Sequence, residues 1–222
     1  MKVSYVDHMG DDLRVANVAR KSFGAGFDTW SEEPRSARGR SDRELVMSLA
    51  AEGHFLPFRH PHLTVECDAP IPVARQLGKH QVGMEWSEIS RRYKTKGIEF
   101  YRIGDRWRAD VKDRRQGSGE LLPPEKQTIL SQIEEAVITM GINSYEAALE
   151  HGASPEQARF LLPQGMIVSW TWTGSLLAFL HLYKQRSHPD AQLETREFAE
   201  QVADIVYKLW PVSWVANVGV DE

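Results

Sequence analysis

Cationic and hydrogen-bonding side chains are concentrated in one segment, residues 74–93, which reads ARQLGKHQVGMEWSEISRRY. Arginine and lysine pair with phosphate groups, and arginine does so in bidentate fashion. Serine, glutamine and glutamate recognise the donors and acceptors of a heterocyclic ring. The segment therefore suits a phosphorylated, heteroatom-rich ligand. Its cations and the polar residues among them are Arg75, Lys79, Arg91 and Arg92, with Gln76, His80, Gln81, Glu88 and Ser90.

The spacing of these residues predicts a helix through VARQLGKHQ and an extended stretch over residues 85–93. Arg75 and Lys79 would share one helical face, and Glu88, Ser90 and Arg92 would project to one side of the extended stretch. Together they would form one polar wall. The alternative is a solvated face with weak surface ion pairs, the usual outcome for alternating charges. Interleaved large side chains favour the wall, because they must pack against other structure: Trp86, Ile89 and Tyr93.

Composition limits the classes to which the protein can belong. The chain has 222 residues, 41% of them hydrophobic, and a net charge of -4. A core of useful size is therefore possible, whereas a general nucleic-acid coat is disfavoured. The single cysteine, Cys67, excludes an internal disulfide and fits a reducing cytoplasm, so we expect a cytoplasmic protein. We expect no membrane association, since the start of the chain lacks a signal-peptide pattern and no stretch approaches the length of a transmembrane helix.

The apolar patterns predict a mixed α and β protein with much helix and few strands. KVSYVDH, HLTVECDA and GMIVSWTWT are typical of strands, and in the second of these Leu63, Val65 and Cys67 share the apolar side. Long helices are predicted over residues 123–152, 174–186 and 190–210. Residues 24–40 and 94–122 are predicted to be loops. No glycine-rich phosphate loop follows a strand, which argues against dinucleotide or nucleoside-triphosphate fingerprints.

Several ordered blocks of the chain resemble the flavin-dependent thymidylate synthases. The segment RQLGKHQVGMEWSEISRRY resembles their Arg-His-Arg, spacer, Ser and Arg-Tyr signature. HMGDDLRVANVARKSF, EGHFLPFRHPHLTVECDAPIPVARQ, QARFLLP, SWTWTGSL and RSHPDAQLETREFA resemble further blocks in the right order. The resemblance implies one domain over residues 1–222. It also implies an α+β, thymidylate synthase-complementing-protein-like fold, with a central, mostly antiparallel sheet flanked by long helices.

The chain departs from the family pattern at several positions. The triplet reads Lys79-His80-Gln81, so two arginines are replaced. The spacer before Ser90 is one residue longer than usual. Gln185 stands where a leucine is usual, and His181 stands where an asparagine is common. These differences are typical of a divergent subgroup.

The resemblance implies reductive methylation of dUMP to dTMP. Methylenetetrahydrofolate would supply the carbon, NADPH the hydride, and FAD would carry it, in a homotetramer whose sites lie between subunits. The unrelated class of thymidylate synthase uses a nucleophilic cysteine, and Cys67 on the apolar side of a strand is more typical of core filling. Uracil would then be activated by a guanidinium that stabilises the developing negative charge.

The resemblance also assigns roles to individual residues. Arg186 would activate the base, and Ser90 would act with it through hydrogen bonding rather than as a nucleophile, since no Asp-His relay has triad-like spacing. The residues implied for dUMP are Gln76, Lys79, Glu88, Ser90, Arg92, Arg159 and Arg186. The residues implied for FAD are His54, Lys79, His80, Gln81, Glu88, Ser175 and His181. We expect no metal, because no histidine pair has zinc-site spacing with a carboxylate.

Purely structural roles and other functions are alternatives to these assignments. Arg186 could simply satisfy helix-end carbonyls, Arg159 could be a surface charge, and Arg92 a strand-edge ion pair. A lone histidine is more often a core or capping residue than a ligand. At the level of the whole protein, a non-catalytic nucleic-acid-binding module could use residues 75–93 with the basic pieces RSARGR and DVKDRRQ, although we expect no nucleic-acid partner. A third possibility keeps the fold without FAD binding or activity.

Overall fold

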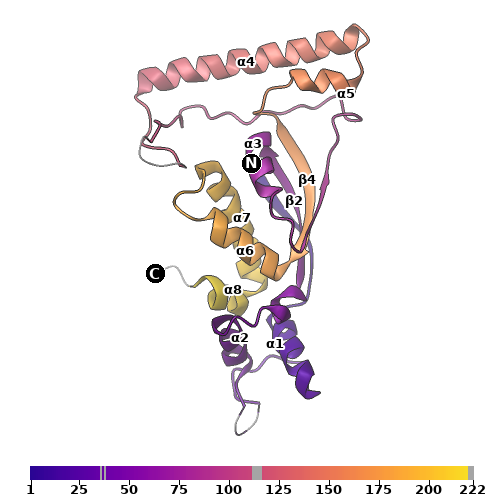
Figure 1. Ribbon diagram of the computed structural model, residues 1–222, viewed down its shortest axis with the longest axis vertical. Coiled ribbons are helices and arrows are strands. Elements are labelled where there is room, and N and C mark those ends of the chain that lie inside the picture. The colour runs from indigo at the N-terminus through magenta and orange to yellow at the C-terminus, as the bar shows by residue number, and fades with distance from the viewer. Residues whose placement is uncertain (36, 38, 112–116, 220–222) are drawn as a thin grey trace.

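The computed structural model describes residues 1–35, 37, 39–111 and 117–219 (Figure 1). Within these residues four strands form one sheet in the order β1-β2-β4-β3, and every pairing in the sheet is antiparallel. This arrangement confirms the expected α+β fold with a central antiparallel sheet. The strands are β1 Lys2–Met9, β2 His62–Pro70, β3 Met84–Glu88 and β4 Ile167–Ser175.

Helices account for most of the other described residues, and they include the long helices expected after residue 122. The carboxyl-terminal helix α8 was not predicted from the sequence. The helices are α1 Asp12–Arg20, α2 Asp42–Ala51, α3 Ile71–Leu77, α4 Pro124–Glu150, α5 Pro155–Ala158, α6 Leu176–Arg186, α7 Leu193–Leu209 and α8 Pro211–Val218, with 3-10 turns η1 Lys21–Phe23, η2 Leu56–Arg59 and η3 Arg159–Leu161.

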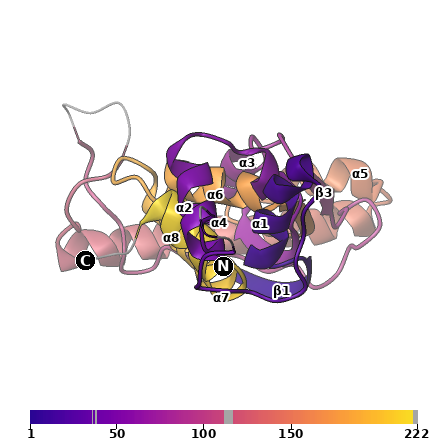
Figure 2. The ribbon, with the colours of Figure 1, turned by 90° about the horizontal axis from the view of Figure 1, so that it is seen from below.

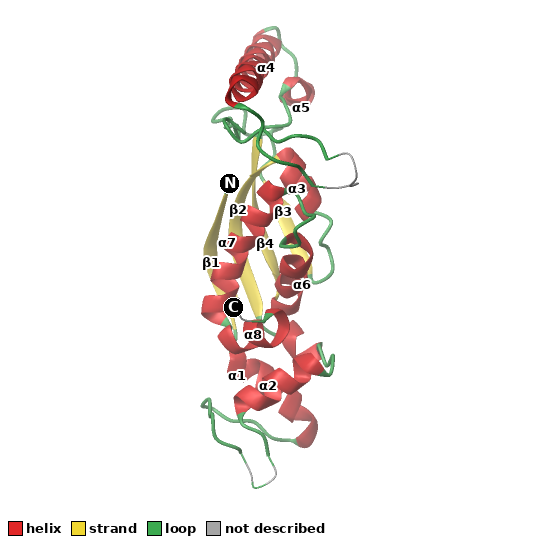
Figure 3. Ribbon diagram, turned by 90° about the vertical axis from the view of Figure 1, so that its left-hand side faces the viewer, coloured by secondary structure: helices red, strands yellow, loops and turns green. Residues whose placement is uncertain are grey.

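The core lies between one face of the sheet and helices α3, α6 and α7, which run along it (Figures 1 and 3). Strand alternation places Trp170 and Trp172 of β4 on this face, where Trp170 stacks on Phe198 of α7. Leu63, Val65 and Cys67 of β2 are buried on the same face, as their alternation predicted. The opposite face is polar and is linked across strands by hydrogen bonds, such as Thr171 to Glu66 at 2.6 Å.

The two ends of the molecule differ in how they are packed. Helices α1, α2 and α8 gather at one end, and α4 and α5 lie at the other, so that α4 is behind α1 and α2 when viewed along the long axis (Figures 1 and 2). Along α4 the side chains of Ile129, Ile133, Val137 and Met140 are each more than half exposed. No helix among the described residues combines the length and apolar character needed to span a membrane.

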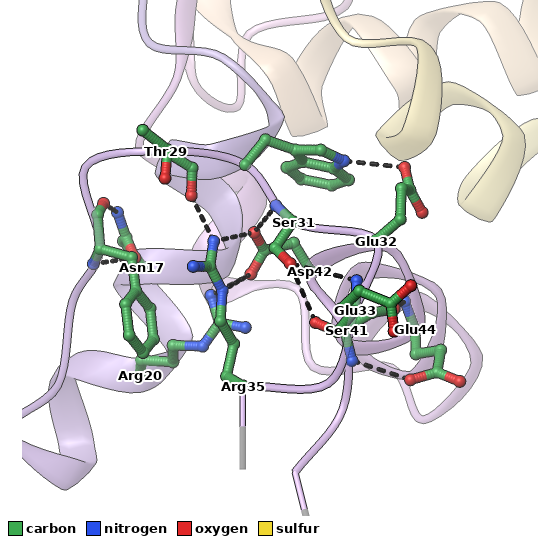
Figure 4. Close-up of polar contacts among 12 residues, drawn as sticks. Asn17, Arg20, Thr29, Ser31, Glu32, Glu33, Arg35, Ser41, Asp42 and Glu44 are labelled. Carbon is green, nitrogen blue, oxygen red and sulfur yellow. Dashed lines mark hydrogen bonds and ion pairs between the residues drawn. The ribbon is translucent and has the colours of Figure 1, made fainter.

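The end that carries α2 is held together by a buried carboxylate. Asp42, fully buried at the start of α2, forms ion pairs with Arg20 and Arg35, both at 2.5 Å, and accepts a hydrogen bond from the Ser31 amide at 2.7 Å (Figure 4). Both guanidinium groups also lie over the Phe27 ring. Burial raises the pKa of Asp42, but the hydrogen bonds from Arg35, Ser31 and Arg20 outweigh it and lower the pKa overall.

The predicted loops over residues 24–40 and 94–122 contain no helix or strand in their described parts. The cluster around Asp42 fixes the first of them to α1 and α2. Residues 36, 38 and 112–116 lie outside the described residues. The basic pieces RSARGR and DVKDRRQ of the nucleic-acid hypothesis therefore fall partly outside them too.

Candidate active site

A groove of about 930 Å³ lies between α3 and the edge strand β3. Its floor includes Met166, Val168 and Trp172 of the region leading into and along β4, and η3 contributes Arg159 and Phe160. The groove brings together predicted site residues from segments that are up to 80 positions apart in the chain, since it contains both Lys79 and Arg159. The predicted residues that line it are Lys79, His80, Gln81, Glu88, Ser90 and Arg159.

The spacing predicted a helix that continues through the triplet Lys79-His80-Gln81, but the structure shows that the helix ends before it. Helix α3 ends at Leu77, so Lys79, His80 and Gln81 lie in the following turn. Gly78 has low helix propensity, and the His80 amide donates to the Leu77 carbonyl at 2.9 Å, which closes the turn. The prediction that Arg75 and Lys79 share one helical face is therefore wrong. The turn nevertheless delivers all of the triplet to the groove.

The extended stretch is also shorter than predicted. Strand β3 ends at Glu88, where its pairing with β4 stops at Trp170. Beyond it the chain turns, with the Tyr93 and Lys94 amides both donating to the Ser90 carbonyl at 3.1 Å. Strand alternation therefore does not put Ser90 and Arg92 on the same side as Glu88, as had been predicted. Instead the Ser90 hydroxyl accepts from Arg92 Nε at 3.2 Å, which keeps these two residues together.

Trp86 is a wall of the groove that the sequence analysis did not assign to the site. Its ring stacks on Trp170 with centroids 4.1 Å apart, and its Nε1 donates to a Glu88 carboxylate oxygen at 3.2 Å. Alternation along β3 puts Met84, Trp86 and Glu88 on one side, and this was the signal that could have identified it. Phe160 also lines the groove without having been predicted for it. Arg75 and Arg91 line it too; they were counted among the cations of this segment from the sequence but were given no individual ligand role.

Arg186, the last residue of α6, is tied to the groove through His80. Its Nε donates to His80 Nε2 at 2.8 Å, and its Nη2 donates to the Gln76 carbonyl at 3.1 Å. The carbonyl belongs to the last turn of α3, where helix carbonyls lack partners and the helix dipole favours a cation. Gln76 itself accepts from the buried Thr195 hydroxyl at 3.2 Å. Arg186, Gln76 and His80 therefore form one unit in which α3, α6 and α7 meet.

The electrostatics of this unit favour a neutral imidazole. Burial, with the adjacent Arg186 cation, lowers the pKa of His80 from its ordinary value of 6.5 to about 4. Burial also lowers the pKa of Arg186, whose guanidinium stays charged at neutral pH. Arg186 does not itself line the groove, and its Nη1 group has no hydrogen-bond partner among the described residues.

Arg159 and Arg92 differ in how they relate to the groove. Arg159 is exposed at the groove, and its Nε donates to the Glu156 carbonyl at 3.2 Å, which leaves its terminal amino groups without a partner among the described residues. Arg92 is exposed and lies over the Tyr93 ring, and it reaches the groove through Ser90. Both positions allow contact with an anion.

The remaining residues predicted for FAD gather near the start of α6. The Ser175 hydroxyl is buried and caps this helix by accepting from the Ala178 amide at 3.3 Å. His181 packs against Phe55 with ring centroids 6.0 Å apart, and His54 is the exposed residue before Phe55. Partial burial, together with Lys184 and Arg59, lowers the pKa of His181. The groove turn adjoins this group, because the Ser175 amide donates to the Gly83 carbonyl at 3.0 Å.

Cys67 lies away from the groove's chemistry. It is buried in β2, and this burial raises the pKa of its thiol. The neighbouring carboxylates of Glu66 and Asp68 raise the pKa further, by a smaller amount. A thiol in this state is a poor nucleophile. No cluster of histidine, cysteine or acidic side chains suited to a metal ion occurs in the part of the chain that the structure describes.

Comparisons with known proteins show the family to which the chain belongs. The family model described as thymidylate synthase complementing protein matches residues 4–212. A relative from Thermus thermophilus named flavin-dependent thymidylate synthase is 34% identical over 215 residues, covering 96% of this chain and 74% of the relative. A relative of the same name from Thermosipho africanus is 32% identical over 212 residues, covering 95% and 88%.

A solved structure gives the same result for the fold. The UMP/dUMP methylase PolB from Streptomyces cacaoi, bound with 5-Br dUMP, superposes with a TM-score of 0.82 at 27% identity, covering 97% of this chain and 93% of that one. The match therefore includes the sheet, the helices along it and the groove-forming segments. The chain belongs to the thymidylate synthase complementing protein family, the family of the flavin-dependent thymidylate synthases.

Proposed function

We propose that this protein is a flavin-dependent thymidylate synthase that methylates dUMP to dTMP. It is an enzyme of the methyltransferase class, in keeping with its family and with a neighbour of known structure that is a UMP/dUMP methylase. Methylenetetrahydrofolate is the proposed carbon donor and NADPH the proposed reductant. The observation that carries the proposal is the groove, in which Lys79, Glu88, Ser90 and Arg159 converge beside the Arg186–His80 pair.

The nucleotide phosphate is proposed to bind to the cations at the groove. The terminal amino groups of Arg159 have no partner among the described residues, and Lys79 is an exposed ammonium that lines the same groove. Arg92 and Ser90 form a hydrogen-bonded pair that can join the same anion. Charge-assisted hydrogen bonds of this kind are the strong ones in proteins, so a phosphate monoester is the ligand that such a set favours.

The uracil ring is proposed to be activated by Arg186 without a sulfur nucleophile. Its Nη1 group, which has no partner among the described residues, can donate to a ring carbonyl and stabilise negative charge as it develops there. Glu88 provides acceptors for the ring N–H group. The Gln76 side chain, which was also predicted for dUMP, is engaged by hydrogen bonds with Thr195 and Gln192. The burial of Cys67 supports this route.

The groove and the start of α6 fit a flavin dinucleotide in their chemistry. The exposed cation Lys79 and the donors of His80 and Gln81 suit its phosphates, and the flat Trp86 ring suits a planar ring system. Bound FAD would supply the chemistry of hydride transfer between reductant and the carbon attached to the base. The residues proposed to hold it are His54, Lys79, His80, Gln81, Glu88, Ser175 and His181.

A homotetramer is part of the proposal, supported by the apolar stripe on α4. Ile129, Ile133, Val137 and Met140 recur at helical spacing and are more than half exposed, which is unfavourable unless another surface covers them. Light scattering during size exclusion should give a tetramer mass. Ile133→Glu should reduce it, whereas the control Lys126→Glu, an exposed position on the same helix, should not.

Flavin binding and turnover test the proposed function directly. The purified protein should be yellow or become yellow with FAD, bleach under NADPH without oxygen, and form dTMP from dUMP and methylenetetrahydrofolate. Arg186→Ala should keep the fold and the flavin but lose dTMP formation. The control Arg102→Ala, which removes an exposed ion pair with Glu135, should remain active. A protein that stays colourless at high FAD would refute the proposal.

A further inference from the structure

The Arg186–His80 hydrogen bond determines which imidazole nitrogen carries the proton. Arginine Nε is always a donor, since the guanidinium does not lose its proton in proteins. His80 Nε2, at 2.8 Å from it, must therefore be the acceptor. A neutral imidazole that accepts at Nε2 carries its proton on Nδ1. The structure thus fixes both the charge state and the tautomer of His80.

We propose that His80 is a positioning residue for Arg186: its neutral, Nδ1-protonated imidazole holds the guanidinium in place beside the groove. This inference rests on the proposed function, in which Arg186 contacts the uracil of dUMP. It adds a role that differs from a direct flavin contact, because His80 would act on the nucleotide through another side chain.

The geometry that carries the proposal is the two-point support of one guanidinium. Arg186 Nε is held by His80 and its Nη2 by the Gln76 carbonyl at 3.1 Å. The two supports come from adjacent turns of one segment, and the Thr195 hydroxyl fixes the Gln76 side chain beside them. With these donors occupied, rotation of the guanidinium is restricted and Nη1 keeps one orientation. A side chain held by two hydrogen bonds loses less entropy when it binds its ligand.

The charges around His80 are consistent with a neutral ring that stays an acceptor. Arg186 faces it from α6, and its own segment adds Lys79 and Arg75. Across the groove lie Arg91 and Arg159, with Glu88 as the acidic side chain among the described lining residues. Burial and the Arg186 cation both disfavour the imidazolium form, and they lower the pKa of His80. Protonation would turn the acceptor into a donor and break the bond to Arg186.

A binding experiment without flavin separates this role from a flavin contact. We expect His80→Leu to weaken dUMP binding to the flavin-free protein by about tenfold or more, the size expected for losing a hydrogen bond to a charged group. His80→Gln, whose side-chain oxygen can accept from Arg186 Nε, should restore most of the affinity. His151→Leu, an exposed histidine at the end of α4, is the matched control and should leave the dUMP Kd unchanged.

A double-mutant cycle measures the coupling between the two residues. Arg186→Lys alone should weaken dUMP binding, and adding His80→Leu should produce little further loss, because the imidazole acts through the guanidinium. Additive losses would show that His80 acts independently of Arg186. Circular dichroism and thermal melting of each variant separate loss of binding from loss of folding.

Nitrogen-15 NMR of labelled histidine tests the contact without any ligand. In the wild type His80 should show a neutral ring with a protonated Nδ1, titrating well below 6.5, and in Arg186→Gln its pKa should rise. A ring protonated at Nε2 would overturn the inference. If the wild type binds dUMP but His80→Leu binds it equally well, the inference fails while the proposed function stands. If the wild type does not bind dUMP at all, both fail, whatever the tautomer.

Discussion

The buried carboxylate of Asp42 gives the sharpest stability prediction for this protein. Replacing it with alanine removes the counterion shared by Arg20 and Arg35, whose side chains are only 10% and 17% exposed. Both guanidinium groups, which lie over the Phe27 ring, would then have no carboxylate from Asp42 to compensate their charge. The Ser31 amide would also lose its acceptor. The expected result is a large loss of folding free energy at the α2 end.

The magnitude follows from the burial of the three side chains. Breaking a buried ion pair by removing one partner costs about 3–5 kcal/mol. Because both arginines keep some solvent contact, we take the lower end, about 3 kcal/mol. For a chain of this size each kcal/mol lowers Tm by about 2–4 °C. Asp42→Ala should therefore melt about 6–12 °C below the wild type.

Differential scanning calorimetry at one fixed protein concentration is the assay, since oligomerisation makes Tm depend on concentration. The matched control is Arg43→Ala on the same helix, which removes an exposed ion pair with Glu32. Exposed pairs contribute about 0–1 kcal/mol, so this variant should melt close to the wild type. Equal Tm values for Asp42→Ala and Arg43→Ala would refute the reasoning.

The difference in Tm between the wild type and Asp42→Ala should depend on pH, and the direction of this dependence follows from the pKa of Asp42. The pKa of folded Asp42 lies below its ordinary value of 3.8, so its ion pairs contribute their full stability above that pH. That contribution is lost as the pH falls through the folded pKa. The Tm difference between wild type and Asp42→Ala should therefore be constant near neutral pH and shrink in strong acid. A difference that shrinks already at neutral pH would contradict this assignment.

Three further predictions concern the groove, the packing of α4 and the single cysteine. Because Trp86 lines the groove, ligand binding should change the tryptophan emission of the wild type, and Trp86→Leu should remove most of that change; an unaltered response in the variant would place the ligand elsewhere. Gly141→Ala should destabilise the packing of α4 by about 1–3 kcal/mol in urea denaturation, because its Cβ would lie 2.5 Å from Pro163 Cδ, whereas Gly26→Ala, with open space around it, should be neutral. Cys67→Ala should keep dTMP formation while losing about 1 kcal/mol of stability from the core; loss of turnover in a folded Cys67→Ala protein would count against activation of uracil without sulfur.

Local patterns accounted for much of the fold. Alternation along residues 62–69 placed Cys67 with Leu63 and Val65 in the core, and the structure confirms it. The long helices after residue 122 were also predicted, because their apolar spacing continues over many turns. Helix ends were less well predicted: α3 stops at Leu77 because Gly78 favours a turn over another helical residue, and polar residues beyond it gave no periodic signal.

The groove itself was only partly predictable. The order of motif blocks identified Lys79, Glu88 and Arg159 as candidates, and the structure brings them to one cavity. Trp86 was not assigned, although its strand position placed it beside Glu88. The reason is that a large aromatic side chain in a strand is typical of core, and only the packing of β3 at the edge of the sheet makes Trp86 a lining residue of the groove.

The sequence by itself determined which residues are apolar, which segments alternate as strands and which family the motif blocks resemble, because these properties are local or can be read in chain order. Only the tertiary structure decided that Arg186 donates to His80 and to the Gln76 carbonyl, across 106 and 110 positions. Those contacts depend on how α3, α6 and α7 pack against the sheet. A hydrogen bond between distant residues is set by the distances and directions that packing imposes, and no residue spacing encodes them.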